Sequence, residues 1–315
     1  MNHYFKRIHV LLATLLLFSI SCSSNKINSE KLDKAIVSIE TGFTISKVRT
    51  AQNKGKTYIV ASSYEGTVIG VSYDGKELWR NELSGFMNHD LWAGDISGDG
   101  VDEILAANAD GSIYCLNNKG KLLWKFKQNE APMYAVCVIN KDDKAYVVCG
   151  GYDNSYYYVS PKGKLISEIA SKTYSVEKPY SKAKKVLPPK GLHLTNFLRP
   201  AKLNGKEILV VHGVQNSMNG NGTLYYFNPL EKLPYKTIKV KERGPYGDLK
   251  VGVVDEKGNS EVLMGRVGAQ AKGMHFTKIS IENPEKQSII DLRKAKDKAS
   301  LSCNPVLLIL VSPTL

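Results

Sequence analysis

Hydrophobic and polar residues alternate over short segments along most of this 315-residue chain, and the segments are of two repeating kinds. The first kind has a polar start, a short apolar run and a small-residue end, and its copies are residues 56–63, 102–109, 144–151, 206–213 and 260–267. The second kind has an alternating strand, a tight turn and another strand, and its copies are residues 65–79, 110–124, 154–167, 221–234 and 272–286. Val, Ile and Tyr between Gly, Asn and Asp are typical of strands. No comparable segment beyond the first 22 residues has a helical period.

The two kinds of segment follow each other in a constant order, and the clearest copies are offset by 45 residues. A repeat of this length that carries several strands is typical of a β-propeller blade. We therefore expect an all-β fold, a β-propeller over 43–290 with about five four-stranded blades stacked around an axis. The expected blades are 43–86, 87–130, 131–190, 191–244 and 245–290. Trp79 and Trp124, at the ends of two repeats, are expected to lock neighbouring blades together.

The last segment, 291–315, does not follow the repeat, and it ends in "SLSCNPVLLILVSPTL". We expect it to be irregular. Two alternatives stay open at this point: a small ring of five blades, or a chain that is truncated or frame-shifted near Ser300.

The first 22 residues resemble the signal peptide of a bacterial lipoprotein. Lys6 and Arg7 precede an apolar run, and "SISC" places Cys22 directly after it. The resemblance implies a lipid on Cys22, a polar tether over 23–42, and attachment to a membrane of the bacterial cell envelope. Ser23 after the cysteine implies the outer membrane. The alternative is an ordinary cleaved signal followed by an accidental cysteine.

Two further resemblances concern the repeats. "GTVIGVSYDGKELW" and its copies look like the repeats of quinoprotein-like (PQQ-like) propellers, and "DISGDGVDEIL" is similar to the calcium loop of FG-GAP or VCBS-type propeller repeats. Both resemblances cover about 43–290. They imply the propeller fold and say little about activity, because propellers host many functions.

The segment "DISGDGVDE" carries oxygen groups at alternate positions and a glycine at the sixth. Calcium prefers six to eight oxygen ligands, and the spacing offers them from Asp95, Ser97, Asp99, the backbone of Val101, and Glu103. The alternative is a metal-free turn whose acids accept hydrogen bonds from backbone amides. The matching segment 255–261 is two residues shorter, and other blades have lost the pattern. We therefore expect a structural calcium rather than a catalytic one.

Composition narrows the classes of partner. The formal net charge is +13, from scattered Lys rather than Arg clusters, which favours a solvated basic surface over nucleic-acid binding. Cys115, Cys137 and Cys149 lie in apolar runs and are expected to be buried thiols, although an exported protein also permits a disulfide.

Three functions compete. The main interpretation is a non-catalytic envelope lipoprotein whose propeller binds a protein or a glycan. The alternative is a propeller-type polysaccharide lyase or hydrolase. A quinone-dependent dehydrogenase is disfavoured, and no quinone is expected, because such enzymes commonly carry adjacent cysteines and this sequence has none.

Candidate ligand-binding residues gather where the inner strands are expected to begin, at one axial end of the channel. They combine imidazoles, acids, cations and aromatics, a mixture that suits a sugar. Polar side chains at strand entries can also simply satisfy loop amides. The candidates are His89, Asp90, Trp92, Tyr134, His193, Arg199, Asp248 and, close to them, Lys250.

Overall fold

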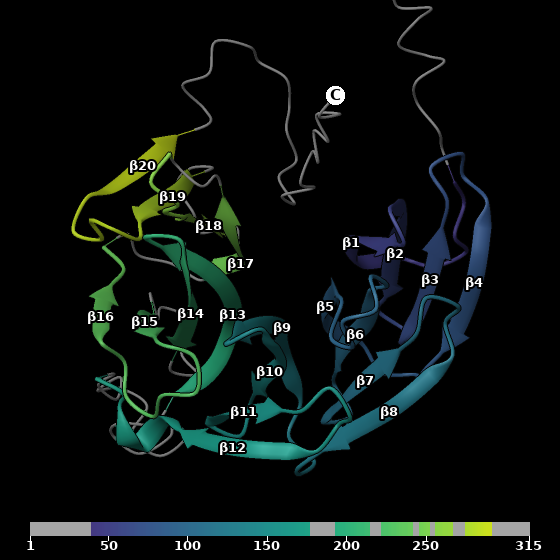
Figure 1. Cartoon of the computed structure of the whole chain (residues 1–315), viewed down its shortest axis with the longest axis horizontal. Helices are drawn as coiled ribbons and strands as arrows, with labels where there is room; N and C mark the ends of the chain where they lie inside the picture. The colour runs from purple at the N-terminus through teal and green to yellow at the C-terminus, as the bar shows by residue number, and fades with distance from the viewer. Residues whose placement is uncertain are drawn as a thin grey trace, which may run out of the picture. The chain divides into compact units, whose positions relative to one another are not determined.

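The computed structural model describes residues 39–176, 193–214, 222–241, 246–252, 256–266 and 275–291. The described residues from Thr41 onward belong to one compact unit, which contains all the described strands. Over the described residues, 20 strands form five antiparallel four-stranded sheets, each in the order of the chain (Figure 1). The all-β propeller fold and its five four-stranded blades are thereby confirmed.

Each blade contains four consecutive strands. Blade 1 has β1 (Ile45–Asn53), β2 (Lys56–Ser63), β3 (Thr67–Val71) and β4 (Glu77–Glu82). Blade 2 has β5 (Asn88–Gly94), β6 (Glu103–Asn108), β7 (Ser112–Leu116) and β8 (Leu122–Lys127). Blade 3 has β9 (Met133–Lys141), β10 (Lys144–Gly151), β11 (Ser155–Val159) and β12 (Leu165–Ala170). Blade 4 has β13 (Leu194–Leu203), β14 (Lys206–Val214), β15 (Thr223–Phe227) and β16 (Lys236–Lys239). Blade 5 has β17 (Tyr246–Gly252), β18 (Glu261–Arg266), β19 (His275–Ser280) and β20 (Gln287–Asp291).

Several sequence-based predictions lie outside the described residues. These are the signal peptide with Cys22, the tether up to residue 38, and the segment 292–315 with Cys303. At the end of the expected third blade, 131–190, residues up to 176 are described, and Ser171–Thr173 form a short 3-10 helix. Among the described parts of the chain, no helix has the length and apolar character to cross a membrane. The described cysteines Cys115, Cys137 and Cys149 are buried free thiols.

Burial explains the hydrophobic pattern of the blades. The third strands β3, β7, β11 and β15 are buried at every position. Neighbouring blades cover both faces of β7, β11 and β15, whereas one face of β3 packs against blade 2 and the other against Phe43. Their continuous apolar runs, such as SYYYV and TLYYF, follow from this double burial. The fourth strands β4, β8 and β12 are largely exposed, which places the outer edge of each blade in solvent.

The first strands are the inner ones (Figure 1). β1 contacts β5, β5 contacts β9, β9 contacts β13, and β13 contacts β17, so the first strands of successive blades lie against each other. Inner strands therefore place side chains from all five blades near the axis.

The two tryptophans join neighbouring blades, as predicted. The indole of Trp79 in blade 1 lies so close to Gly120 of blade 2 that a Cβ at Gly120 would collide with it. Trp124 of blade 2 covers Gly163 of blade 3 in the same way, and its Nε1 donates to the backbone oxygen of Pro161 at 2.8 Å. Each glycine therefore provides the space that the preceding blade's indole needs.

The loop 95–103 also joins two blades. The backbone nitrogen of Lys54, in the β1–β2 turn, donates to Gly100 at 3.0 Å, and that of Asp102 donates to Gln52 at 2.9 Å. The Asp102 carboxylate accepts from the backbone nitrogen of Gln52 at 2.8 Å. These bonds attach blade 2 to the hairpin of blade 1.

The related segment in blade 5 repeats this attachment. Ser260 donates from its backbone to Lys202 at 2.8 Å, and its hydroxyl accepts from the backbone nitrogen of Lys202 at 2.9 Å. Ser260 therefore takes the place of Asp102 against the β13–β14 hairpin. The loop 95–103 and the segment of blade 5 that contains Ser260 therefore both connect neighbouring blades, although they do not share the metal-binding sequence pattern.

Candidate functional site in the axial channel

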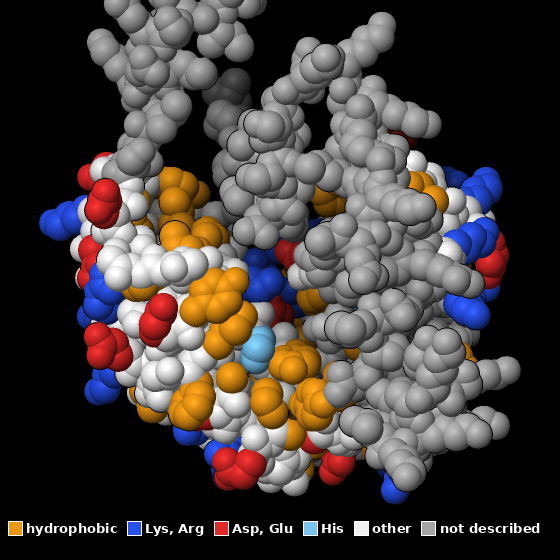
Figure 2. Space-filling model, turned by 180° about the vertical axis from the view of Figure 1, so that it is seen from behind, with side chains coloured by type: hydrophobic (Ala, Val, Ile, Leu, Met, Phe, Trp, Pro, Cys, Tyr) orange, Lys and Arg blue, Asp and Glu red, His pale blue; other side chains and the backbone are white. Residues whose placement is uncertain are grey.

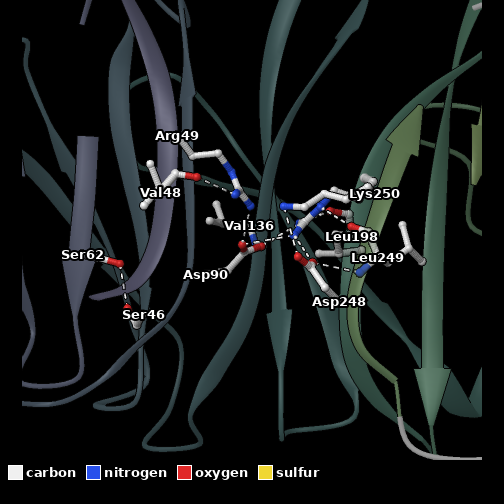
Figure 3. Close-up of polar contacts among 11 residues, drawn as sticks. Ser46, Val48, Arg49, Ser62, Asp90, Val136, Leu198, Asp248, Leu249 and Lys250 are labelled. Atoms are coloured by element: carbon white, nitrogen blue, oxygen red, sulfur yellow. Dashed lines mark hydrogen bonds and ion pairs between the residues drawn. The ribbon is translucent and has the colours of Figure 1, made fainter. Parts of the chain in front are cut away.

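Asp90 on β5 is the centre of a buried polar cluster at the axis (Figure 3). Its Oδ2 accepts from Arg199 Nη1 at 2.6 Å and from the backbone nitrogen of Val136 at 3.2 Å. Its Oδ1 accepts from Arg199 Nη2 and from Arg49 Nη2, both at 3.1 Å. Asp90 as a whole residue is 1% exposed. Burial would raise the pKa of Asp90, but the attraction of Arg199 and Arg49 outweighs burial and holds that pKa below its usual range.

Arg199 extends the cluster to blade 5. Its Nε donates to the backbone oxygen of Leu249 at 3.2 Å, and its Nη1 also donates to that of Leu198 at 2.7 Å. Asp248 Oδ1 lies 4.0 Å from Arg199 Nη2, and Asp248 Oδ2 lies 3.2 Å from Lys250 Nζ. All five inner strands therefore contribute a polar group to one connected cluster.

A pocket with a volume of about 520 Å³ lies beside this cluster. Its lining includes Arg49 of β1, Trp92 of β5, Arg199 of β13 and Lys250 of β17, so it is bordered by four blades. Figure 2 shows one face of the molecule, with charged side chains in the hollow at its middle and hydrophobic side chains gathered near it. The guanidinium carbon of Arg199 lies 5.8 Å from the centre of the Trp92 ring, so the cation covers part of the indole.

The environment of Lys250 is unusual. Burial lowers the pKa of the Lys250 ammonium to about 8, repulsion by Arg49 and Arg199 adds to this, and Asp248 opposes it. The pocket thus holds a cation that is poorly solvated and only partly neutralised.

Five of the residues named from the sequence belong to the cluster and pocket: Asp90, Trp92, Arg199, Asp248 and Lys250. His89 and Tyr134 do not line the pocket. Their rings pack edge to face with centres 4.5 Å apart, and Tyr134 packs against Tyr152 at 6.1 Å. Burial, together with Lys47, lowers the pKa of His89. These three rings form a separate aromatic group near the start of β5 and β9.

His193 lies in a buried aromatic cluster, away from the pocket lining. Its Nδ1 is 2.8 Å from Ser175 Oγ and its Nε2 is 3.2 Å from Tyr174 OH, while its ring stacks on Tyr225. Burial lowers the pKa of His193 to about 3, so the ring is neutral in the folded protein. Its contacts anchor the segment after β12 to blade 4.

The predicted calcium loop is closed by its own hydrogen bonds. The Asp95 carboxylate accepts from the backbone nitrogens of Gly98 at 2.6 Å, Asp99 at 3.2 Å and Gly100 at 2.9 Å. Asp99 accepts from Val101, and Glu103 accepts from Ile96. Within the described residues, no three His, Cys, Asp or Glu side chains are grouped to hold a metal ion. Calcium at Asp95, Ser97, Asp99, Val101 and Glu103 stays a prediction.

Sequence reasoning did not identify Arg49 as a site residue. A usable signal was present in the strand register. Arg49 pairs with Val60 and Arg199 pairs with Val210, each the fifth residue of its second strand. Aligning the repeats on their second strands therefore places the two arginines at one level of the channel.

Comparisons with known proteins agree with the fold and add a family. The WD40 domain of Pan2 from Neurospora crassa superimposes with a TM-score of 0.53 and 10% identity, covering 79% of this chain and 65% of that one. The crystal structure of BBS1N in complex with ARL6DN gives a TM-score of 0.51 and 14% identity, covering 72% of this chain and 64% of that one. At such identities, these likenesses support the propeller architecture alone.

Two curated relatives are much more similar in sequence. A λ-carrageenase of Pseudoalteromonas carrageenovora is 44% identical over 267 residues, and one of a Pseudoalteromonas species is 43% identical over 267 residues. Each alignment covers 84% of this chain and 28% of the relative, so the chain spans just over a quarter of their length. The family model of the λ-carrageenase β-propeller domain matches residues 58–304, which takes in all strands from β3 to β20. With most of its blades inside that match, the chain belongs to the family of λ-carrageenase β-propeller domains.

Proposed function

We propose that this chain acts in the hydrolysis of a carrageenan-type sulfated galactan, as the propeller part that binds the polysaccharide. The observation that carries the proposal is the 44% identity to a λ-carrageenase over 84% of this chain. This favours the hydrolase alternative over a scaffold for an unrelated protein partner. Because the chain spans 28% of that relative, the activity of the whole relative is itself part of the proposal.

The chemistry of the channel supports a binding role for the propeller. Glycoside hydrolysis usually uses two carboxyl groups, one of which stays protonated to act as an acid. In the channel, Asp90 is held ionised by two arginines, and Asp248 contacts Lys250. Asp90 therefore does not have the environment of an acid catalyst. The pocket instead combines cations with Trp92, which suits an anionic sugar.

The test uses the full chain with λ-carrageenan, and with neutral agarose as the control polysaccharide. Reducing ends report hydrolysis, and retardation in a gel that contains the polysaccharide reports binding. We expect retardation by λ-carrageenan but not by agarose. Released reducing ends would show that this chain also carries the hydrolytic groups. A chain that neither binds λ-carrageenan nor cleaves it would disprove the proposal.

A lipid on Cys22 would place this function at the cell surface. A polysaccharide is too large to enter a cell before it has been cut, so its hydrolase has to meet it outside. We expect wild-type protein to enter the detergent phase in a phase-separation assay and Cys22→Ala to stay in the aqueous phase. Aqueous partition of both proteins would contradict lipidation.

A further inference from the structure

The buried carboxylate at the centre of the axial cluster has no capacity left for a ligand. Asp90 accepts four hydrogen bonds, from Arg199, Arg49 and the backbone of Val136. Asp248 accepts from the backbone nitrogen of Leu249 at 2.9 Å and contacts Lys250. Asp90 is therefore fully engaged within the protein, while Asp248 is held as the counter-ion of Lys250.

The cations next to the pocket retain spare donors. Arg49 has five N–H groups, and its bonds to described residues are one to the backbone oxygen of Val48 and one to Asp90. The Lys250 ammonium has three N–H groups, and its ion pair among the described residues is the one with Asp248. The Arg49 and Lys250 side chains are 16% and 26% exposed, so a ligand in the pocket reaches both.

Charge leads to the same conclusion as the donors. Among the described residues, Arg49, Arg199 and Lys250 form their ion pairs with Asp90 and Asp248, which leaves one positive charge in excess. Lys202 and Glu207 also line the pocket and cancel each other. A buried excess charge is costly unless a counter-ion is present. The pocket is therefore suited to one singly charged oxyanion.

We propose that Arg49 and Lys250 form a subsite in the axial pocket that binds one sulfate ester group of the polysaccharide. This inference rests on the proposed function and names the residues that recognise its charge. The guanidinium offers a flat edge for two sulfate oxygens, and the ammonium offers a point charge for a third. Trp92 supplies an apolar wall beside them for the sugar ring.

The subsite has a defined pH dependence. A sulfate ester stays ionised at all ordinary pH values, so the protonation of Lys250 determines how the affinity changes with pH. Three charged groups face this ammonium, namely Arg49 from β1, Arg199 from β13 and Asp248 from β17. Binding requires the charged ammonium, and its pKa in the empty pocket is about 8. Affinity should therefore be constant near pH 6 and fall as the pH rises above 8.

The experiment measures the dissociation constants of λ-carrageenan oligosaccharides by titration calorimetry for wild type, Arg49→Gln and Lys250→Met. Lys164→Gln is the matched control, because Lys164 is exposed and lies outside the pocket. Each pocket variant should weaken binding about tenfold or more, as expected for one ionic hydrogen bond. Lys250→Met should also lose the decline above pH 8. Lys164→Gln should bind like wild type.

Two further ligands identify the anion. Chemically desulfated oligosaccharides should bind weakly and equally to wild type and to both pocket variants. Galacturonate oligosaccharides carry a carboxylate in place of the sulfate, and tight binding of these that depends on Arg49 and Lys250 would overturn the sulfate assignment.

The remaining outcomes separate this inference from the proposed function. Wild-type affinity for sulfated oligosaccharides in both pocket variants would overturn the subsite and leave the proposed function standing. No binding by wild type would overturn both. Because Arg49 also contacts Asp90, binding by Arg49→Gln is measured only at temperatures where circular dichroism shows that the variant is folded. Lys250→Met provides an independent second result.

Discussion

The substitution Asp90→Asn tests the idea that one carboxylate stabilises the ring through all its inner strands. The side chain keeps its shape but loses its charge, and its amide group then faces the guanidinium donors. Arg199, whose side chain is 3% exposed, loses its main counter-ion. Breaking a buried ion pair on one side costs about 3–5 kcal/mol, because an uncompensated charge stays in the interior. For a domain of this size, that corresponds to a fall in melting temperature of about 10 °C.

The assay is urea denaturation at pH 7 with circular dichroism and fluorescence as independent probes. Glu77→Gln is the matched control, since Arg80 and Glu77 form a similar two-bond pair, with Arg80 Nε and Nη2 at 3.1 and 2.6 Å from the carboxylate. That pair is exposed to solvent, so its loss should change stability little. If Asp90→Asn costs no more than Glu77→Gln, the buried cluster does not stabilise the ring and the reasoning is wrong.

The pH dependence provides a second check on Asp90. The pKa of Asp90 is lowered in the folded state, so its contribution to the free energy of unfolding is present above the unfolded-state pKa of about 4. That contribution is lost as the pH falls through the lower folded-state pKa. The Asp90→Asn variant should lack this part of the acid unfolding curve. An unchanged curve would show that other carboxylates cause the acid sensitivity.

Three further predictions follow from the structure. Gly120→Ala should lower the melting temperature more than Gly205→Ala, because both backbones have a positive φ, at 73° and 74°, but only the first Cβ would meet the indole of Trp79. The pKa of His193 is about 3 in the folded state and about 6.5 in the unfolded state. The free energy of unfolding should therefore decrease as the pH falls from 6.5 to 3. His193→Gln should remove this slope in urea titrations across that range. Calcium should raise the melting temperature of the wild-type protein, and Asp99→Ala should abolish this rise. Magnesium should have no effect on either protein. An equal calcium response in the variant would exclude this loop as the binding site.

The blades could be predicted from sequence because their signals are local. The residues 56–63 and 144–151 that were marked as repeat units coincide with β2 and β10. Apolar runs, turn glycines and a fixed repeat length are all visible within about 45 residues of chain. The roles of Trp79 and Trp124 followed from the same repetition, because each is the last residue of its repeat segment, 65–79 or 110–124.

The axial cluster was harder to predict because it depends on contacts between distant parts of the chain. Arg199 and Asp90 are 109 residues apart, and no motif connects them. Arg49 lies in a strand whose local sequence is polar and unremarkable, so nothing near it indicated a site. His193 was chosen for its position before an inner strand, and that local view did not show that Tyr174 and Ser175 bury its ring.

The axial cluster both holds the inner strands together and supplies the cations proposed to bind sulfate. This double role limits which residues of the pocket can be replaced without loss of stability. Arg199 uses its donors on Asp90 and on backbone oxygens, so replacing it removes contacts between blades as well as charge. Lys250 contacts only the partly exposed Asp248 among the described residues, so its replacement leaves the links between blades 1 and 4 intact. A substitution made to change ligand preference should therefore reduce stability least at Lys250 and most at Arg199. Replacing Lys250 should alter affinity without changing the urea midpoint, and replacing Arg199 should lower both.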